Sequence, residues 1–452
     1  MSEDTRKIAL FILNTLDKGR KTLDRVMQDV TAETPLLPRR DLALLYALVY
    51  GVLRWRGRLD WTVGHFSNTD MKKIDPKVLN ILRLGLFQII YLDRIPVSAA
   101  VNTSVEMAKP FAPLHVVRFV NAILRRAAGE YKNIPFPDLN KDPLSALAVE
   151  KSFPKWLIKR WLERFGLNET GALCDSANTI PPITVRTNTL KTTRDKLVQS
   201  LEREVGKIFR TIYAPDGVCL FNLKKSIPDM KSFEDGWFQV QDEAAQLVTH
   251  LLNPQPGENV LDACAGLGGK TGHIAQMMKN HGNVVAMDKD DEKLLQLKTE
   301  MKRLGVSIVT TDHYDLNKSL SKKHFSEFDR VLLDAPCSGL GVLRRNPDIK
   351  WTKSKKRLKI HQEKQVTFLN NLATFVKPSG VLVFSVCSLE PEENEMVIND
   401  FLNKRSNFVI ENSTMGLPLK ARSLVNSNRH LRTLPHLHNM DGFFSVSLKR
   451  TK

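Results

Sequence analysis

Two of the five cysteines each lie at or just after the end of an apolar segment of the sequence. Cys337 follows an apolar segment that ends at Asp334, and Cys387 ends the apolar segment 381–387. If these segments are neighbouring strands of a parallel sheet, both thiols lie at its carboxyl edge, where such sheets bind ligands. A single buried cysteine is commonly a packing residue, and this alternative applies to each cysteine alone. Two at equivalent strand ends favour chemistry, because a thiolate is a strong nucleophile.

A glycine-rich loop lies before both cysteines. Residues 260–271 read Val-Leu-Asp-Ala-Cys-Ala-Gly-Leu-Gly-Gly-Lys-Thr, which predicts a strand, a turn and the start of a helix. Glycines at this place let the backbone approach a ligand at a helix N-terminus. A P-loop requires glycine where Cys264 stands, and a dinucleotide fingerprint requires glycine where Thr271 stands. The loop therefore departs from both patterns by one residue.

Asp288 indicates that the ligand of the glycine-rich loop contains an adenosine. It ends the next predicted strand, and a carboxylate at that place accepts hydrogen bonds from the ribose hydroxyls of an adenosine cofactor. S-adenosylmethionine and NAD both meet this requirement. The alternative is that Asp288 caps the following helix, whose first residues include Asp290 and Glu292.

Together the thiols and the loop suit methylation of carbon 5 of a cytosine. That carbon is too weak a nucleophile to attack a sulfonium methyl group, but a thiolate added at carbon 6 converts the ring into an enamine that is strong enough. Asp334 is placed to hydrogen-bond the pyrimidine edge and to favour the protonated ring nitrogen that stabilises the adduct. Carbon 5 then loses its proton and the thiolate leaves, a step that a second thiol assists.

A target base must leave its stack, which requires cations and apolar surface near the site. Residues 341–351 follow the Asp334 motif and read Gly-Val-Leu-Arg-Arg-Asn-Pro-Asp-Ile-Lys-Trp. We expect this segment to contact RNA. The alternative is an ordinary basic loop.

The elements that position these residues follow from hydrophobic periodicity. Apolar segments alternate with turns and helices, and they predict strands at 259–264, 284–288, 307–311, 329–334 and 381–387. This alternation is typical of an α/β, Rossmann-like domain with a doubly wound, mostly parallel sheet. The basic and aperiodic stretch 420–438 predicts a long loop before a last strand at 443–448.

The chain is long enough for three domains. Residues 1–135 predict an all-α, RNA-binding bundle, residues 150–240 a small α+β connector, and residues 241–452 the methyltransferase domain. A proline-bearing polar stretch predicts the first boundary. In the bundle, residues 54–61 interleave arginine with tryptophan, which suits phosphates and stacked bases. Core tryptophans with solvated arginines would give the same pattern.

The net charge of +18 and the pI near 9.6 indicate a polyanionic partner, above all nucleic acid. A generally basic soluble enzyme is the alternative. The sequence shows neither an apolar run of membrane-spanning length nor a signal-peptide pattern, so we expect a cytoplasmic protein. The five cysteines are widely spaced without a zinc pattern, which predicts reduced thiols and no metal site.

Several motifs resemble those of bacterial 16S ribosomal RNA cytosine-5 methyltransferases of the Sun/RsmB type. Residues 96–102 and 119–126 are similar to the family's N-terminal domain, which resembles the RNA-binding factor NusB. The segments 152–156, 186–188 and 240–246 resemble those that lead into the catalytic domain, and Asp441-Gly442-Phe443-Phe444 resembles its final strand. The resemblance covers nearly the whole chain.

This resemblance implies S-adenosylmethionine as the cofactor and assigns roles to individual residues. Cys387 is the nucleophile that attacks carbon 6, Cys337 promotes release of the product, and Asp334 completes the catalytic set. The implied cofactor contacts are Cys264, Ala265, Gly266, Leu267, Gly268, Gly269, Lys270, Asp288, Asp312 and Asp334.

Two residues depart from the family pattern. Gly266-Leu267 stands where the family usually has Ala-Pro, and Val386 replaces the usual threonine. Neither change removes a reacting group, so loop rigidity and rate are affected more than reaction type. The implied partner is 16S ribosomal RNA or a partly assembled small ribosomal subunit, bound by a monomer that does not contact a membrane. The same chemistry on transfer RNA and a non-catalytic RNA-binding factor are the alternatives.

Overall fold

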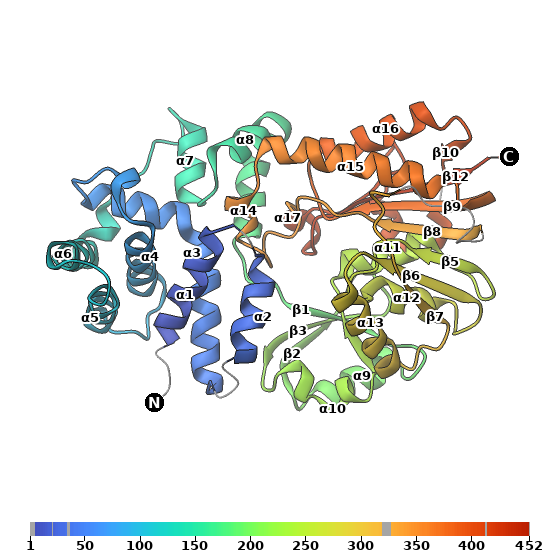
Figure 1. Ribbon diagram of the computed structural model, residues 1–452, viewed down its shortest axis with the longest axis horizontal. Helices are drawn as coiled ribbons and strands as arrows, with labels where there is room; N and C mark the ends of the chain where they lie inside the picture. The colour runs from blue at the N-terminus through green and yellow to red at the C-terminus, as the bar shows by residue number, and fades with distance from the viewer. Residues whose placement is uncertain (1–4, 20, 34–36, 319–326, 412–413, 452) are drawn as a thin grey trace. The chain divides into compact units, whose positions relative to one another are not determined.

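A computed structural model describes residues 5–19, 21–33, 37–318, 327–411 and 414–451 (Figure 1). The chain forms two compact units. The helical unit comprises Met1–Thr179 with Leu343–Lys353, and the α/β unit comprises Ile180–Val342 with Ser354–Lys452. Within the described residues, the helices are too short or too polar to cross a membrane.

The helical unit is built on amphipathic helices whose apolar faces meet in one core. Asp75 caps α4 by accepting hydrogen bonds from the amides of Lys77 and Val78, and Asp142 caps α7 in the same manner. The longest helix, α3, spans 28 residues. The helices are α1 Thr5–Asp17, α2 Leu23–Glu33, α3 Arg39–Phe66, α4 Pro76–Tyr91, α5 Val97–Ala108, α6 Leu114–Glu130, α7 Pro143–Glu150, α8 Lys155–Ala177 and α14 Ile349–Thr352, with 3-10 turns Met71–Lys73 and Tyr131–Asn133.

The basic loop that was predicted to contact RNA is buried in this helical unit. Lys350 donates to the backbone oxygens of Arg54 (3.1 Å) and Ser152 (3.3 Å) and to Asn178 Oδ1 (2.6 Å). The carbonyl of Arg344 accepts a hydrogen bond from Arg54 Nη2 at 2.8 Å. The prediction is wrong for Arg344 and Lys350, whose exposed fractions are 1% and 0%, because protein groups enclose these side chains.

The arginine- and tryptophan-rich stretch 54–61 also makes internal contacts. Arg56 pairs with Asp17 at 3.0 Å, and Trp61 Nε1 donates to the carbonyl of Pro135 at 3.2 Å. The guanidinium of Arg58 lies 5.0 Å from the centre of a phenylalanine ring. These contacts favour the structural interpretation of this stretch.

The α/β unit begins with a small antiparallel sheet in the order β2-β3-β1-β4. Buried residues of its strands pack against Leu197 and Leu201 of α9. This arrangement confirms the predicted α+β connector. Its elements are β1 Ile183–Thr187, α9 Arg194–Leu201, β2 Val205–Arg210, β3 Gly217–Leu223, a 3-10 turn Ile227–Asp229, α10 Lys231–Glu234 and β4 Phe238–Val240.

The larger sheet has the order β10-β12-β9-β8-β5-β6-β7. The strands from β9 to β7 in this order run parallel, and β12 runs antiparallel to both of its neighbours, β9 and β10. The predicted Rossmann-like fold class is therefore confirmed. The strands are β5 Asn259–Asp262, β6 Asn283–Asp288, β7 Val309–His313, β8 Phe328–Asp334, β9 Val376–Val386, β10 Phe408–Ile410 and β12 Phe444–Arg450.

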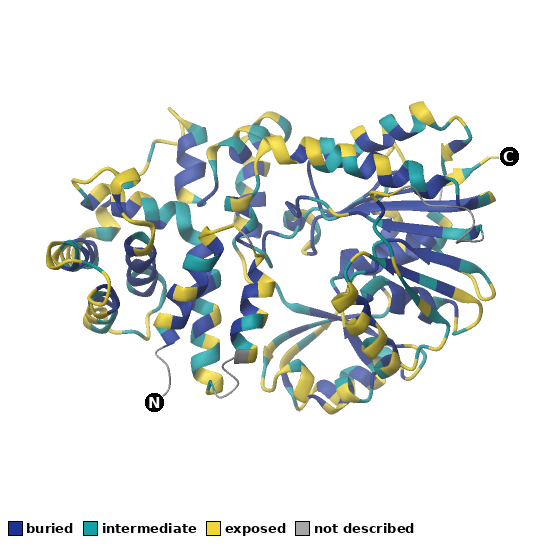
Figure 2. Ribbon diagram, in the orientation of Figure 1, coloured by how far each residue is buried: buried dark blue, intermediate teal, exposed yellow. Residues whose placement is uncertain are grey.

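Helices cover both faces of this sheet, and Figure 2 shows its central strands as buried. Side chains alternate along a strand. Val331 and Leu333 pack with α15 and α16, whereas Leu332 packs with α11 and α12. The helices are α11 Glu243–Leu252, α12 Gly269–Met277, α13 Asp291–Leu304, α15 Lys355–Ala373 and α16 Glu395–Lys404, with a 3-10 turn η4 Pro391–Glu393.

The tail before the last strand is more ordered than predicted. Residues 420–438 contain most of a 3-10 helix (Leu419–Leu424), the short strand β11 (Leu431–Arg432) and α17 (Pro435–His438). Strand β11 pairs with β12, so the sheet orders this stretch. The prediction of a continuous loop is wrong because this pairing is long-range and leaves little periodicity in so short a segment.

Candidate active site

The glycine-rich loop connects β5 to α12 at the carboxyl edge of the large sheet. Gly266 and Gly268 have φ values of 54° and 82°, in the left-handed region that favours glycine. A Cβ at Gly268 would lie 2.7 Å from Leu297. The amide of Ala265 donates to the carbonyl of Met287 at 2.9 Å, which joins the loop to β6. The glycines thus permit a tight turn between β5 and α12 at the carboxyl edge of the sheet.

Asp288 lies at the end of β6, directly beside this loop. Its Oδ2 accepts a hydrogen bond from the amide of Gly266 at 2.9 Å, and its Oδ1 accepts one from the amide of Asp290 at 3.0 Å. The helix cap alternative is wrong, because Asp290 caps α13 by accepting from the amide of Lys293. The half-buried carboxylate of Asp288 keeps further lone pairs, which ribose hydroxyls can use.

A second feature of the loop, the buried carboxylate of Asp262, also suits an adenosine cofactor. Asp262 is 1% exposed, and its Oδ1 has no hydrogen-bond partner among the described residues, while Oδ2 accepts from Thr271 Oγ1 at 2.7 Å. Burial raises the pKa of Asp262 to about 7. An unsatisfied buried oxygen of this kind suits a polar ligand. Asp262 is not among the site residues predicted from the sequence, although it ends a strand as Asp288 and Asp334 do.

Other predicted cofactor contacts lie on the same edge. Asp312 is half-buried in β7, where its backbone is in register with Met287 of β6. Leu267 is 55% exposed at the tip of the loop. Burial raises the pKa of Cys264 well above its usual value, so Cys264 contributes a neutral thiol to the loop. Residues 264–270, Asp288 and Asp312 are thus brought together along three adjacent strands.

Lys270 and Asp334 form an ion pair between the loop and the end of β8. Lys270 Nζ lies 2.5 Å from Asp334 Oδ2, and the two side chains are 11% and 30% exposed. Burial alone lowers the pKa of Lys270, but the pair with Asp334 raises it overall, and Cys387 adds to this effect. Lys270 Nζ also lies 5.4 Å from the centre of the Phe443 ring. A positive charge is therefore held close to the Cys387 sulfur.

The two cysteines at the strand ends lie in contact. Strands β8 and β9 are parallel neighbours, and the Sγ atoms of Cys337 and Cys387 are 3.3 Å apart. The hydrogen bond to Cys387, together with burial, raises the pKa of Cys337 well above its usual value. Cys337 therefore keeps its proton at neutral pH. Cys174 and Cys219 are not part of this pair, since they lie in α8 and β3.

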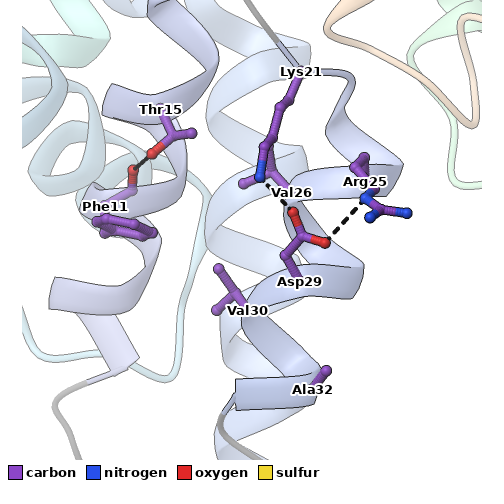
Figure 3. A pocket seen from close by; sticks show the side chains of 8 residues that line it. All are labelled: Phe11, Thr15, Lys21, Arg25, Val26, Asp29, Val30 and Ala32. Carbon is purple, nitrogen blue, oxygen red and sulfur yellow. Dashed lines mark hydrogen bonds and ion pairs between the residues drawn. The ribbon is translucent and has the colours of Figure 1, made fainter.

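A separate hollow lies in the helical unit between α1 and α2 (Figure 3). Its lining includes Lys21, Arg25 and Asp29. Asp29 pairs with Lys21 at 2.7 Å and with Arg25 at 3.1 Å, as the dashed lines show. Both cations therefore have a protein counter-ion, and the lining offers neither thiols nor a glycine-rich loop. The carboxyl edge of the large sheet is the stronger candidate.

The fold and this edge define an S-adenosylmethionine-dependent methyltransferase with paired thiols. Residues 249–449 match the family described as 16S rRNA methyltransferase RsmB/F. Residues 3–129 match the NusB family, and residues 153–224 match the ferredoxin-like domain of Methyltr_RsmF/B-like proteins.

Relatives match over the full length. The probable ribosomal RNA small subunit methyltransferase B of Bacillus subtilis is 36% identical over 98% of both chains. Ribosomal RNA small subunit methyltransferase B of Escherichia coli is 32% identical over 90% of both chains. The crystal structure of PH0851 superposes with a TM-score of 0.80 and 25% identity, covering 100% of both chains. The chain belongs to the ribosomal RNA small subunit methyltransferase B family, which confirms the resemblance found in the sequence motifs.

Proposed function

We propose that this protein transfers a methyl group from S-adenosylmethionine to carbon 5 of a cytosine in 16S ribosomal RNA. The observation that carries the proposal is the contact between Cys337 and Cys387, 3.3 Å apart on the edge that also bears the glycine-rich loop. Adjacent thiols suit a reaction in which one sulfur bonds the substrate and the other handles a proton. The names of the full-length relatives support ribosomal RNA of the small subunit as the substrate.

Cys387 is the proposed nucleophile because the resemblance to the family assigns it this role and because the positive charge of Lys270 is held close to its sulfur. Its sulfur bonds carbon 6, and the electron pair of the carbon 5–carbon 6 double bond becomes available at carbon 5. When bound, the cofactor supplies the electrophilic methyl group. Carbon 5 then loses its proton to solvent water, the double bond forms again, and the sulfur–carbon bond breaks with its electrons returning to Cys387.

Cys337 and Asp334 assist these steps in the proposal. Cys337 holds a proton at Sγ and donates a hydrogen bond to the Cys387 sulfur, which makes that sulfur a better leaving group. Asp334, oriented by Lys270, hydrogen-bonds the pyrimidine edge. The proposed cofactor contacts remain the loop 264–270 with Asp288, Asp312 and Asp334.

An exposed basic cluster supports a polyanionic substrate. Lys355, Lys356, Arg357 and Lys359 are exposed in the first turns of α15. Further along this helix, Gln365 Nε2 donates to the carbonyl of Pro336 at 2.9 Å. A helix rises 1.5 Å per residue, so the cluster lies roughly 9 to 15 Å along α15 from Gln365, which contacts the thiol-bearing loop. This distance suits phosphates that flank the target nucleotide.

We further propose domains at 1–135, 150–240 and 241–452, a monomer, and action in the cytoplasm. The three matched family regions, 3–129, 153–224 and 249–449, support this division. A ribosomal RNA or partly assembled small subunit as substrate supports the cytoplasm as the place of action.

The covalent mechanism is tested with two variants. Cys387→Ala should lower methylation of 16S ribosomal RNA by more than about 10⁴-fold, because the nucleophile is lost. Cys337→Ala should accumulate a protein–RNA adduct that survives denaturing electrophoresis. An adduct with Cys387→Ala but not with Cys337→Ala would reverse the two roles. Mapping 5-methylcytosine in cells with and without the protein tests the substrate, and loss of the mark from transfer RNA alone would contradict it.

A further inference from the structure

A buried acid lies behind the two thiols. Glu393 ends the turn η4, is 0% exposed, and accepts hydrogen bonds from two serines. Its Oε1 accepts from the amide of Ser338 at 2.6 Å, and its Oε2 accepts from Ser338 Oγ at 2.5 Å and from Ser388 Oγ. The cluster of Glu393, Ser338 and Ser388 therefore has three donors directed at one carboxylate.

Each serine of this cluster directly follows a reacting cysteine. Ser338 follows Cys337 after β8, and Ser388 follows Cys387 after β9. One carboxylate therefore joins the two loops that carry the sulfurs. A hydrogen bond between thiols is weak, so the contact between the sulfurs does not hold the loops in place by itself. The bonds to Glu393 are stronger, because hydrogen bonds to a charged acceptor are about twice as strong as neutral ones.

A buried carboxylate is costly unless it is fully hydrogen-bonded. Burial raises the pKa of Glu393, and the hydrogen bonds from Ser338 and Ser388 oppose that shift. A neutral apolar side chain would fill the same space without this cost. The presence of an acid here is therefore better explained by what it does to the thiol loops than by its effect on folding.

We infer that Glu393 is a positioning residue, which holds the sulfurs of Cys337 and Cys387 at the separation needed for product release. The inference rests on the proposed function, in which Cys337 assists departure of the Cys387 sulfur. A misplacement of about 1 Å in a reacting group can cost about 100-fold in rate. The negative charge of Glu393 also favours the protonated form of Cys337, which is the form that donates to the leaving sulfur.

The first experiment measures sulfur proximity without RNA or cofactor. The oxidant diamide takes one hydrogen from each of two adjacent thiols and leaves a disulfide, which mass spectrometry of peptides detects. The Cys337–Cys387 disulfide should form at least about 10-fold more slowly in Glu393→Gln than in the unmodified protein. Glu392→Gln, on the neighbouring half-exposed residue, is the matched control and should form it at the normal rate. An unchanged rate in Glu393→Gln overturns the inference.

The second experiment measures release during methylation. Glu393→Gln should accumulate the covalent protein–RNA adduct and slow its decay about 10- to 100-fold, with cofactor affinity unchanged in calorimetry. A merely structural role would lower the fraction of active protein without prolonging the adduct. If Cys337→Ala accumulates adduct and Glu393→Gln does not, the inference fails while the proposed function stands. If neither does, the proposed function fails.

A third measurement asks whether Glu393 acts through the serines. Ser388→Ala should slow adduct decay on its own but add little in the Glu393→Gln background, because both changes remove the same hydrogen bond. Fully additive effects would show that Glu393 acts independently of Ser388 and would overturn the positioning role. Melting curves of each variant identify any that fail to fold, and Ser388→Ala then provides the test in place of Glu393→Gln.

Discussion

The carboxyl edge of the large sheet has two differently built halves. The half proposed to bind the cofactor, here the cofactor half, consists of residues 262–270, Asp288 and Asp312, and it presents backbone amides and carboxylates with unused lone pairs. The thiol half consists of residues 334–338 and 387–393, where Glu393 and its serine partners are buried and satisfied by one another. The difference suggests that reversible binding uses open polar groups, whereas bond formation needs reacting atoms held in place.

Among variants that keep both thiols, the largest effect is expected from Asp334, in the thiol half. Asp334→Asn should lower kcat by about 10³-fold, because a neutral amide neither orients Lys270 nor favours protonation of the pyrimidine. Single-turnover transfer of labelled methyl groups measures the rate, and calorimetry measures cofactor affinity. If the variant loses cofactor affinity by a similar factor and keeps its single-turnover rate at saturation, Asp334 belongs with the cofactor half.

The next effect concerns stability in the cofactor half. Asp262 has a folded pKa of about 7 against an ordinary value of 3.8. Its contribution to stability is therefore fully present below pH 4 and is lost as pH rises through 7, because the folded state favours the protonated acid. Asp262→Asn should remove this loss, so that the variant gains about 4 kcal/mol relative to the unmodified protein between pH 4 and pH 8. Urea unfolding at several pH values measures the free energy of unfolding of both proteins. If that free energy changes equally with pH in the two proteins, the raised pKa of Asp262 is wrong.

A smaller effect is expected at Asp288. Asp288→Ala should raise the Kd for S-adenosylmethionine about 10- to 100-fold while the rate at saturating cofactor changes little, because ribose contacts contribute equally before and during reaction. Asp290→Ala is the matched control: it removes the cap of α13 and should lower stability by about 1 kcal/mol without changing cofactor affinity. Equal effects of both variants on affinity would assign Asp288 a structural role.

The smallest effect is expected outside both halves, at the basic cluster of α15. The double variant Lys355→Glu and Lys359→Glu should weaken binding of a 16S ribosomal RNA fragment about 10-fold at moderate salt and make binding less dependent on salt. Lys196→Glu, an exposed change in α9 of the connector, is the control. The affinity of both variants for the RNA fragment is measured across a series of salt concentrations, and only the double variant should bind more weakly. A steep, unchanged salt dependence in the double variant would place the phosphate contacts elsewhere.

Much of the site could be predicted because parallel strands end at one edge. Once residues 329–334 and 381–387 were identified as neighbouring strands, the proximity of Cys337 and Cys387 followed from the topology alone. The position of Asp288 beside the glycine-rich loop followed in the same way. By contrast, Lys350 could not be placed from its own segment, because its acceptors are at Arg54, Ser152 and Asn178.

The sequence by itself determined the fold class, the family, and the strand ends that we propose for the chemistry. These follow from local periodicity, from glycine conformation and from motifs read within a few residues. Only the tertiary structure decided that Glu393 joins both thiol loops, that Asp290 rather than Asp288 caps α13, and that Arg344 and Lys350 are buried. The physical reason is that hydrogen bonding and burial of a charged side chain depend on partners distant in sequence, which local patterns do not encode.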